Sequence, residues 1–139
     1  MSANSRLTIA VHILSYMVAV EKKRADPVTS DEIASSVATN PVVIRRMLGP
    51  LRRAGIVVSH RGAKAGWNLA RGADAITLLD VYQAVEGRPL FGMHASPPNP
   101  HCRIARGLKP ALNRLYGGLE AQLKRELSRT TIAQVLPDS

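Results

Sequence analysis

Two adjacent arginines stand among apolar side chains in the segment NPVVIRRML, which spans residues 40–48. These residues, Arg45 and Arg46, belong to a longer basic stretch, because no acidic residue occurs between Glu32 and Asp74. A stretch this one-sided repels itself in a folded domain unless a polyanion binds it. With a formal net charge of +9, the chain is expected to bind an anionic macromolecule, an ordinary solvated basic face being the alternative. The same stretch carries Arg52, Arg53, Arg61, Lys64 and Arg71.

The charge pattern favours nucleic acid over a membrane surface as the polyanion. No segment combines the cations with a stripe of Trp, Phe and Leu that could enter lipid. The apolar run of residues 7–20 is short for a membrane span, which takes about 20 apolar residues. It also has amphipathic spacing and no small-residue cleavage site after it, unlike a signal peptide. We therefore expect a cytoplasmic protein without a membrane partner.

The residues that could support redox or metal chemistry lie in and beside a proline-rich segment, residues 88–102. Cys102 is the only cysteine, so no disulfide can form within the chain. His94, His101 and Cys102 are zinc-type ligands, but adjacent ligands rarely serve one ion and no fourth is evident, so no metal is expected. Cys102 is then either a buried structural thiol or a redox switch that neighbouring arginines activate.

No arrangement of residues predicts catalysis. The chain lacks an evident Ser/His/Asp order, a phosphate-cradling glycine loop and a pair of carboxylates in a polar setting. We therefore predict no catalytic residues, and a protein that is not an enzyme.

The elements that position Arg45 and Arg46 begin with an amphipathic helix over residues 7–20. Thr29, with Glu32 three residues later, predicts a capping box and a short helix from near Ser30 to around Ala38. Asn40 and Pro41 are a favoured N-cap and first helical residue for the next helix. Two short helices joined by a few residues indicate a helix-turn-helix.

The second of these helices is expected to bury one face and expose its arginines. Its apolar positions fall inward, which leaves the cations on or beside the outward face. Gly49 and Pro50 should kink or interrupt it, and Gly55 should end it. The inward residues are Val43, Ile44, Met47, Leu48 and Leu51.

A β-hairpin should follow, because residues 56–60 and 67–71 have strand patterns and residues 61–66 supply glycines for the tip. A helix-turn-helix followed by a basic hairpin is a winged helix, so the predicted fold is mainly α with a small two-stranded wing. Thr77, with Asp80 at the capping-box position, should begin a fourth helix that closes at Gly87.

A long leucine stripe marks the C-terminal part of the chain. It extends over about three heptads and requires a packing partner, either a second copy of the chain or the chain's own domain. We favour a twofold dimer. Pro110 and the pair Gly117–Gly118 should bend or break the helix, and residues 130–136 form a short last segment. The predicted dimer contacts are Leu108, Leu112, Leu115, Leu119 and Leu123.

Taken together, these features resemble the Rrf-two family of bacterial winged-helix transcription regulators, which includes the iron–sulfur cluster regulator and a cysteine-metabolism repressor. The resemblance is carried by the run NPVVIRRMLGPLRRAGIVVSHRGAKAGWNLAR followed by ITLLDVYQAVEG. It extends to the N-terminal helix beginning SRL, a variable loop and the long C-terminal helix. Cluster-binding members carry three cysteines in that loop, whereas only Cys102 is present here, so no iron–sulfur cluster is expected.

The resemblance implies a homodimer that binds double-stranded DNA at an imperfect palindrome near promoters, most often as a repressor. Arg45 matches the position where the family's recognition helix reads bases, and Arg61 matches the wing arginine that enters the minor groove. Cys102 departs from the cluster-binding pattern, and its two interpretations, structural thiol and redox switch, both stay open. The full set of expected DNA contacts is Thr29, Ser30, Asn40, Val42, Arg45, Arg46, Arg61 and Lys64.

The predicted organisation is a winged helix-turn-helix over residues 1–87, a variable loop over 88–102, and a dimerisation helix with its tail over 103–139. The alternative function is a winged helix that binds a protein partner or senses a ligand without reading DNA sequence. An uncharged or acidic recognition helix would have favoured that alternative, and Arg45 and Arg46 argue against it.

Overall fold

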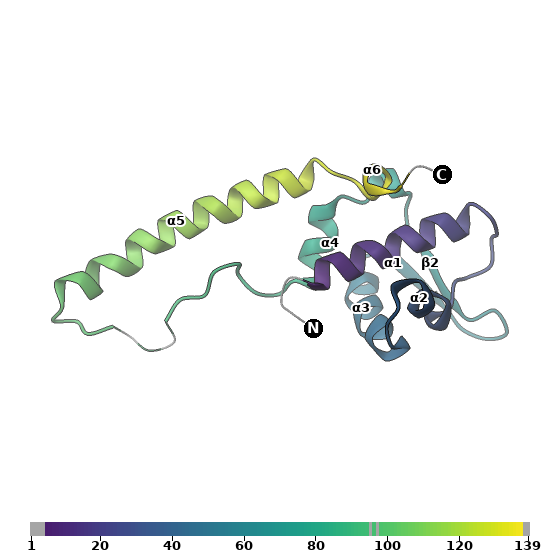
Figure 1. Ribbon diagram of the computed structural model, residues 1–139, viewed down its shortest axis with the longest axis horizontal. Coiled ribbons are helices and arrows are strands. Elements are labelled where there is room, and N and C mark those ends of the chain that lie inside the picture. The colour runs from purple at the N-terminus through teal and green to yellow at the C-terminus, as the bar shows by residue number, and fades with distance from the viewer. Residues whose placement is uncertain (1–4, 95, 97, 138–139) are drawn as a thin grey trace. The chain divides into compact units, whose positions relative to one another are not determined.

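The computed structural model describes residues 5–94, 96 and 98–137, so the outermost residues of the predicted segments, 1–4 and 138–139, lie outside it. The fold is mainly helical with one two-stranded antiparallel sheet, as predicted. No helix among the described residues is long and apolar enough to cross a membrane. In chain order (Figure 1) the elements are α1 (Ser5–Glu21), α2 (Ser30–Val37), α3 (Pro41–Arg53), β1 (Val57–His60), β2 (Gly66–Leu69), the 3-10 turn η1 (Ala73–Ala75), α4 (Leu78–Val85), α5 (Arg103–Ser128) and α6 (Ile132–Val135).

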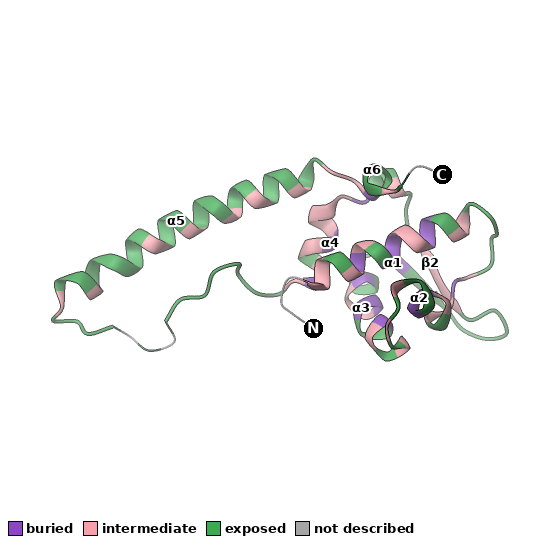
Figure 2. Cartoon of the chain, viewed as in Figure 1, coloured by how far each residue is buried: buried purple, intermediate pink, exposed green. Residues whose placement is uncertain are grey.

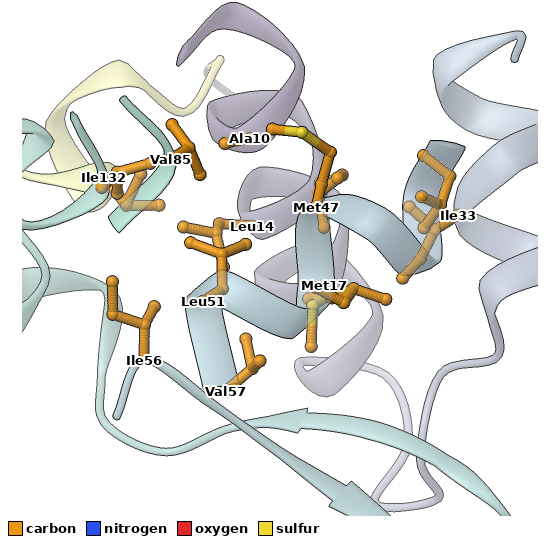
Figure 3. Packing of buried hydrophobic residues seen from close by; sticks show 14 of the residues in the cluster. Ala10, Leu14, Met17, Ile33, Met47, Leu51, Ile56, Val57, Val85 and Ile132 are labelled. Atoms are coloured by element: carbon orange, nitrogen blue, oxygen red, sulfur yellow. The ribbon is translucent and has the colours of Figure 1, made fainter. Parts of the chain in front are cut away.

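The chain forms two compact units. The head unit comprises residues 1–87 and 127–139, and the loop–helix unit comprises residues 88–126. All the buried hydrophobic residues of the described chain belong to the head unit, as the purple segments of Figure 2 show. Side chains from α1, α3, α4 and α6 converge in its core (Figure 3), where Ala10, Met47, Val85 and Ile132 represent those four helices.

The caps of α2 and α3 confirm the predicted helix-turn-helix. Thr29 Oγ1 accepts the Glu32 backbone N–H at 3.2 Å, and Asn40 Oδ1 accepts the Val42 N–H at 2.8 Å. Between the helices, Ala38 adopts φ 62°, a left-handed conformation that turns the chain. Local residue chemistry therefore fixes where both helices begin.

The end of α3 departs in part from the sequence expectation. The helix runs without interruption to Arg53 and includes Pro50, which removes only one backbone donor in its last turn. Gly55, at φ 74°, donates its N–H to the Arg52 carbonyl, and the Ile56 N–H bonds the Leu51 carbonyl. These two bonds form a Schellman motif, so Gly55 ends the helix as predicted.

The wing is a hairpin in which Val57 pairs with Leu69 and His60 pairs with Gly66. The β2 strand begins one residue earlier than predicted. A contact that the sequence did not predict ties the wing to the α1–α2 loop, since Val28 and Trp67 exchange backbone hydrogen bonds of 2.9 and 2.8 Å. A Cβ at Gly66 would lie 2.8 Å from the Val28 carbonyl oxygen, so only glycine allows this approach.

A carboxylate at the end of α1 gives the wing a second attachment. Glu21 Oε1 accepts the Leu69 backbone N–H at 2.8 Å and the Asn68 side-chain amide at 3.0 Å. Glu21 is half-buried, and hydrogen bonds to a charged acceptor are stronger than neutral ones. The carboxylate therefore fixes β2 against α1.

The C-terminal segment returns to the head unit. Ile132 is fully buried, and its N–H donates to the Ile76 carbonyl at 2.9 Å, while Leu78 donates to the Thr130 carbonyl at 2.8 Å. Thr77 caps α4 with a reciprocal box to Asp80, as predicted. No local pattern predicts the return of Ile132, because this return depends on contacts between segments far apart in the chain.

The loop–helix unit consists of the segment after α4 and most of α5. The helix is one continuous element of 26 residues, so Pro110 and the pair Gly117–Gly118 do not break it. The loop runs back along α5, because Phe91 stacks on Tyr116 with 4.7 Å between ring centroids and the Leu90 N–H donates to Glu120.

We expect Glu21→Ala to lower the free energy of unfolding by about 1–3 kcal/mol, because it leaves the Leu69 N–H and the Asn68 amide without their shared acceptor. Urea denaturation followed by circular dichroism would measure this as a lower midpoint at unchanged slope. The neighbouring exposed residue supplies the control, since Lys23→Ala should change stability by less than about 0.5 kcal/mol. Equal midpoints for Glu21→Ala and the wild type would contradict the role of this carboxylate.

Candidate nucleic-acid interface

The α3 helix presents two cations on the face opposite its buried residues. Arg45 and Arg46 are exposed, whereas Ile44, Met47 and Leu48 are buried in the head core. None of the described residues forms an ion pair or hydrogen bond with either guanidinium. Both charges are therefore available to an external anion. Val43, expected to be buried, is only half-buried.

Residues at the start of α3 and α2 are held by their caps. Asn40 is exposed, and its side-chain oxygen accepts the Val42 N–H. Its side-chain amide nitrogen takes no part in this hydrogen bond and can donate to an external group. Val42 is exposed beside it. Thr29 and Ser30 are half-buried at the start of α2, where backbone N–H groups attract anions. These four residues lie where the helix-turn-helix prediction placed them.

The two wing cations differ in their surroundings. Arg61 is exposed and has no partner among the described residues. Lys64 Nζ lies 3.2 Å from Asp26 Oδ1, with the two side chains 76% and 60% exposed. An ion pair this exposed is worth at most about 1 kcal/mol, so an incoming phosphate can displace the carboxylate. The sequence analysis missed the partner of Lys64, because Asp26 lies far away in the chain.

A second acid near the base of the wing is also engaged. The Glu32 carboxylate pairs with Arg24. Only half of the predicted capping box is therefore formed, because Thr29 accepts the Glu32 N–H while the Glu32 side chain turns to Arg24. Glu32 and Asp26 thus pair with Arg24 and Lys64, whereas Arg45, Arg46 and Arg61 have no such partner among the described residues.

The predicted dimer residues lie on α5, which has no buried residue. Leu108 and Leu115 are 52% and 55% exposed and Leu119 is also exposed, whereas Leu112 and Leu123 are half-buried. Large exposed apolar residues in a row indicate an interaction surface. Cys102 is partly exposed, and its carbonyl accepts the Arg106 N–H at 3.0 Å, which places it at the N-terminal end of α5.

Comparison with known proteins identifies the chain's relatives. A family model described as the iron-dependent transcriptional regulator Rrf2 matches residues 3–138. YwnA of Bacillus subtilis (strain 168), named as an HTH-type transcriptional regulator, is 37% identical over 134 residues, which are 96% of each chain. A crystal structure described as a DNA-binding protein superposes with a TM-score of 0.75 at 34% identity, covering 94% of this chain and 98% of that one. CymR, the global cysteine regulator of B. subtilis, superposes with a TM-score of 0.59 at 26% identity, covering 92% of both chains.

The fold and these matches define a transcriptional regulator built on the winged-helix DNA-binding fold. The chain belongs to the Rrf2 family, which is the Rrf-two family that its sequence resembles.

The iron named in the family description has no fitting ligand set among the described residues. No group of three or more His, Cys, Asp or Glu side chains is placed to hold a metal ion in that part of the chain. The sequence offers one thiol, Cys102, where iron–sulfur clusters are held by several. We therefore propose no role for iron in this protein.

The Lys64–Asp26 pair generates a prediction for DNA affinity. Asp26→Asn removes a carboxylate beside the wing and frees Lys64, so binding to a DNA duplex should tighten several-fold. The slope of log affinity against log salt should stay close to that of the wild type, because Lys64 contacts phosphate in both complexes and no phosphate contact is added. Fluorescence anisotropy at several salt concentrations would measure both quantities. Asp74→Asn is the control for the loss of one exposed acid, and an equal effect of the two substitutions would rule out a specific role for Asp26.

Proposed function

We propose that this protein is a homodimeric repressor that recognises a palindromic promoter site through α3. The observation that carries the proposal is the pair of unpartnered arginines, Arg45 and Arg46, on the exposed face of α3. A helix fits the major groove of DNA, and an arginine can bond the O6 and N7 atoms of guanine with two parallel hydrogen bonds. Membership of a family of transcriptional regulators supports the same role.

Each residue predicted to contact DNA has its own proposed contact. Arg45 reads a base edge, most favourably guanine, and Arg46 supports it on the same face of α3. Arg61, at the wing tip, enters the minor groove. Lys64, released from Asp26, contacts phosphate. Asn40 contacts phosphate with its free amide nitrogen, as do the backbone N–H groups at Thr29 and Ser30, while Val42 offers an apolar contact to a base.

The homodimer is proposed on the exposed stripe of α5. Leu108, Leu115 and Leu119 are exposed on a helix without buried residues, and a second copy of the same stripe would cover them. A twofold axis would place two recognition helices about 34 Å apart, one turn of DNA. A palindromic site then follows from the symmetry of the protein. We propose repression rather than activation because repression is the commoner role in the family.

Control through Cys102 remains part of the proposal. The thiol is partly exposed at the start of α5, so an oxidant can reach it. Oxidation to a sulfenate or to a disulfide across the dimer would alter the loop–helix unit at the start of α5.

Selection of duplexes from a random-sequence DNA library tests the proposed reading of bases. The wild type should enrich an inverted repeat, and Arg45→Ala should lose the base preference at one position of each half-site, because a bidentate contact discriminates by about 1–3 kcal/mol. Arg53→Ala is the matched control, since Arg53 is exposed beyond Pro50, where a phosphate contact or plain solvation is expected.

Two results of this selection would contradict the proposal. One is an enriched sequence that is the same for Arg45→Ala and the wild type. The other is the absence of any enriched sequence for the wild type, which would favour a protein-binding or ligand-sensing role instead.

The dimer proposal has its own test. Leu115→Glu should convert the protein to a monomer and weaken DNA binding, because it places a charge in the proposed contact, while the exposure of Leu115 should leave the head unit folded. Sedimentation equilibrium would measure the mass, and circular dichroism would check the fold. Asn113→Glu adds the same charge to an exposed α5 residue outside the leucine stripe and should stay dimeric. A dimer that persists in Leu115→Glu would place the interface elsewhere.

A further inference from the structure

We propose that the loop–helix unit contains a binding site for a small apolar molecule that carries a single carboxylate or sulfonate group. The site is a cavity of about 290 Å³ between the loop and the first turns of α5. This volume lies near the lower end of the range of about 300–1,000 Å³ for small-molecule pockets. The residues that the argument uses are Met93, His94, Cys102, Ala105, Leu108 and Lys109.

The cavity is built by helical periodicity on one side. Cys102, Ala105, Leu108 and Leu112 follow one another at intervals of three and four residues, so they line one face of α5. The loop supplies the opposite wall with Met93, His94, Ser96 and Pro98. The groove therefore has two sides that come from different segments of the same unit.

The loop is anchored at both ends of this groove. On one side the Leu90 N–H donates to Glu120 and Phe91 stacks on Tyr116. On the other, the Cys102 N–H donates to the Asn99 carbonyl at 3.2 Å, which closes the turn into α5. These contacts position the loop against α5 on both sides of the cavity.

The lining explains why the occupant should be apolar. Ile104 is 73% exposed, and Leu108 and Met93 are also exposed, although all three line the cavity. Apolar residues gathered in a concavity favour an apolar ligand, since burying them removes their surface from water.

The charge around the cavity explains why the occupant should be an anion. No acidic residue occurs between Glu86 and Glu120, and Lys109 is the lysine of the lining. One ammonium group beside apolar walls can pair with one carboxylate or sulfonate while the rest of the molecule contacts the apolar lining. A phosphate dianion would need a second cationic partner in the lining, and none of the lining residues supplies an arginine.

The cavity overlaps the proposed dimer surface at Leu108 and Leu112, which belong to both. Leu115 and Leu119 belong to the leucine stripe but do not line the cavity. A substitution at Leu115 therefore tests the dimer, and a substitution at Ala105 or Lys109 tests the cavity. A role for the bound molecule as an effector of DNA binding rests on the proposed function, whereas ligand binding itself does not.

Fluorescence of 8-anilinonaphthalene-1-sulfonate, an apolar monosulfonate, provides the direct test on the full-length protein. The dye should bind, and octanoate should displace it. Lys109→Gln should weaken displacement by octanoate about tenfold or more, as expected for the loss of one charged hydrogen bond, and should leave displacement by octan-1-ol unchanged. Arg114→Gln, which removes an exposed α5 cation outside the lining, should behave as the wild type.

A second variant fills the cavity. Ala105→Trp places a large side chain inside the groove, so it should abolish dye binding while circular dichroism remains unchanged. The proposal fails if the dye binds equally to Ala105→Trp, or if Lys109→Gln and Arg114→Gln have the same effect. It also fails if only the monomeric Leu115→Glu variant binds the dye, because a second copy of the chain would then be the occupant. DNA binding is measured separately on the same samples. A protein that fails to bind DNA but binds the dye would therefore contradict the proposed function and not the proposed cavity.

Discussion

The rotation of α3 about its own axis is the constraint on which the rest of the molecule depends. Ile44, Met47 and Leu51 fill the head core from one side of this helix, which leaves Arg45 and Arg46 on the other side. A rotation by one residue, about 100°, would bury a guanidinium without a partner, and an unpaired buried charge is prohibitively costly. The apolar residues therefore determine which side chains can reach DNA.

The wing depends on the same core through backbone contacts. Glu21 holds β2 to the end of α1, and the Val28–Trp67 bridge holds it to the following loop. The two acids near this loop pair with Arg24 and Lys64. Arg45, Arg46 and Arg61 consequently stay unpaired among the described residues, whereas Lys64 must leave Asp26 to contact DNA.

Much of the head unit could be predicted from sequence, because local chemistry determines it. Thr29, Asn40, Gly55 and Thr77 begin or end helices through bonds to neighbours a few residues away. Pro50 was predicted either to interrupt α3 or to kink it. The interruption does not occur, since the buried residues on either side of Pro50 hold the last turn in place.

Pro110 and the glycine pair likewise leave α5 unbroken, although a proline inside a helix costs about 3 kcal/mol and a glycine about 1 kcal/mol relative to alanine. What the sequence could not predict is contact between distant segments. The return of Ile132 to the head core, the Val28–Trp67 bridge and the pairing of Lys64 with Asp26 all join residues without a shared local pattern. The sequence allowed each residue of the candidate site to be proposed individually. Which of its cations are paired within the chain could not be predicted, because the pairing depends on these distant contacts. The dimer surface and the DNA contacts stay predictions.

The central claim is that α3 and the wing read DNA sequence, and one titration tests it most directly. Fluorescence anisotropy would compare a labelled duplex from upstream of the protein's own gene with a scrambled duplex of equal length, under reducing conditions and at several salt concentrations. The account predicts that the upstream duplex binds about a thousandfold more tightly or better, as specific regulators do. Equal and steeply salt-dependent binding to both duplexes would contradict sequence reading at this site and leave only charge attraction.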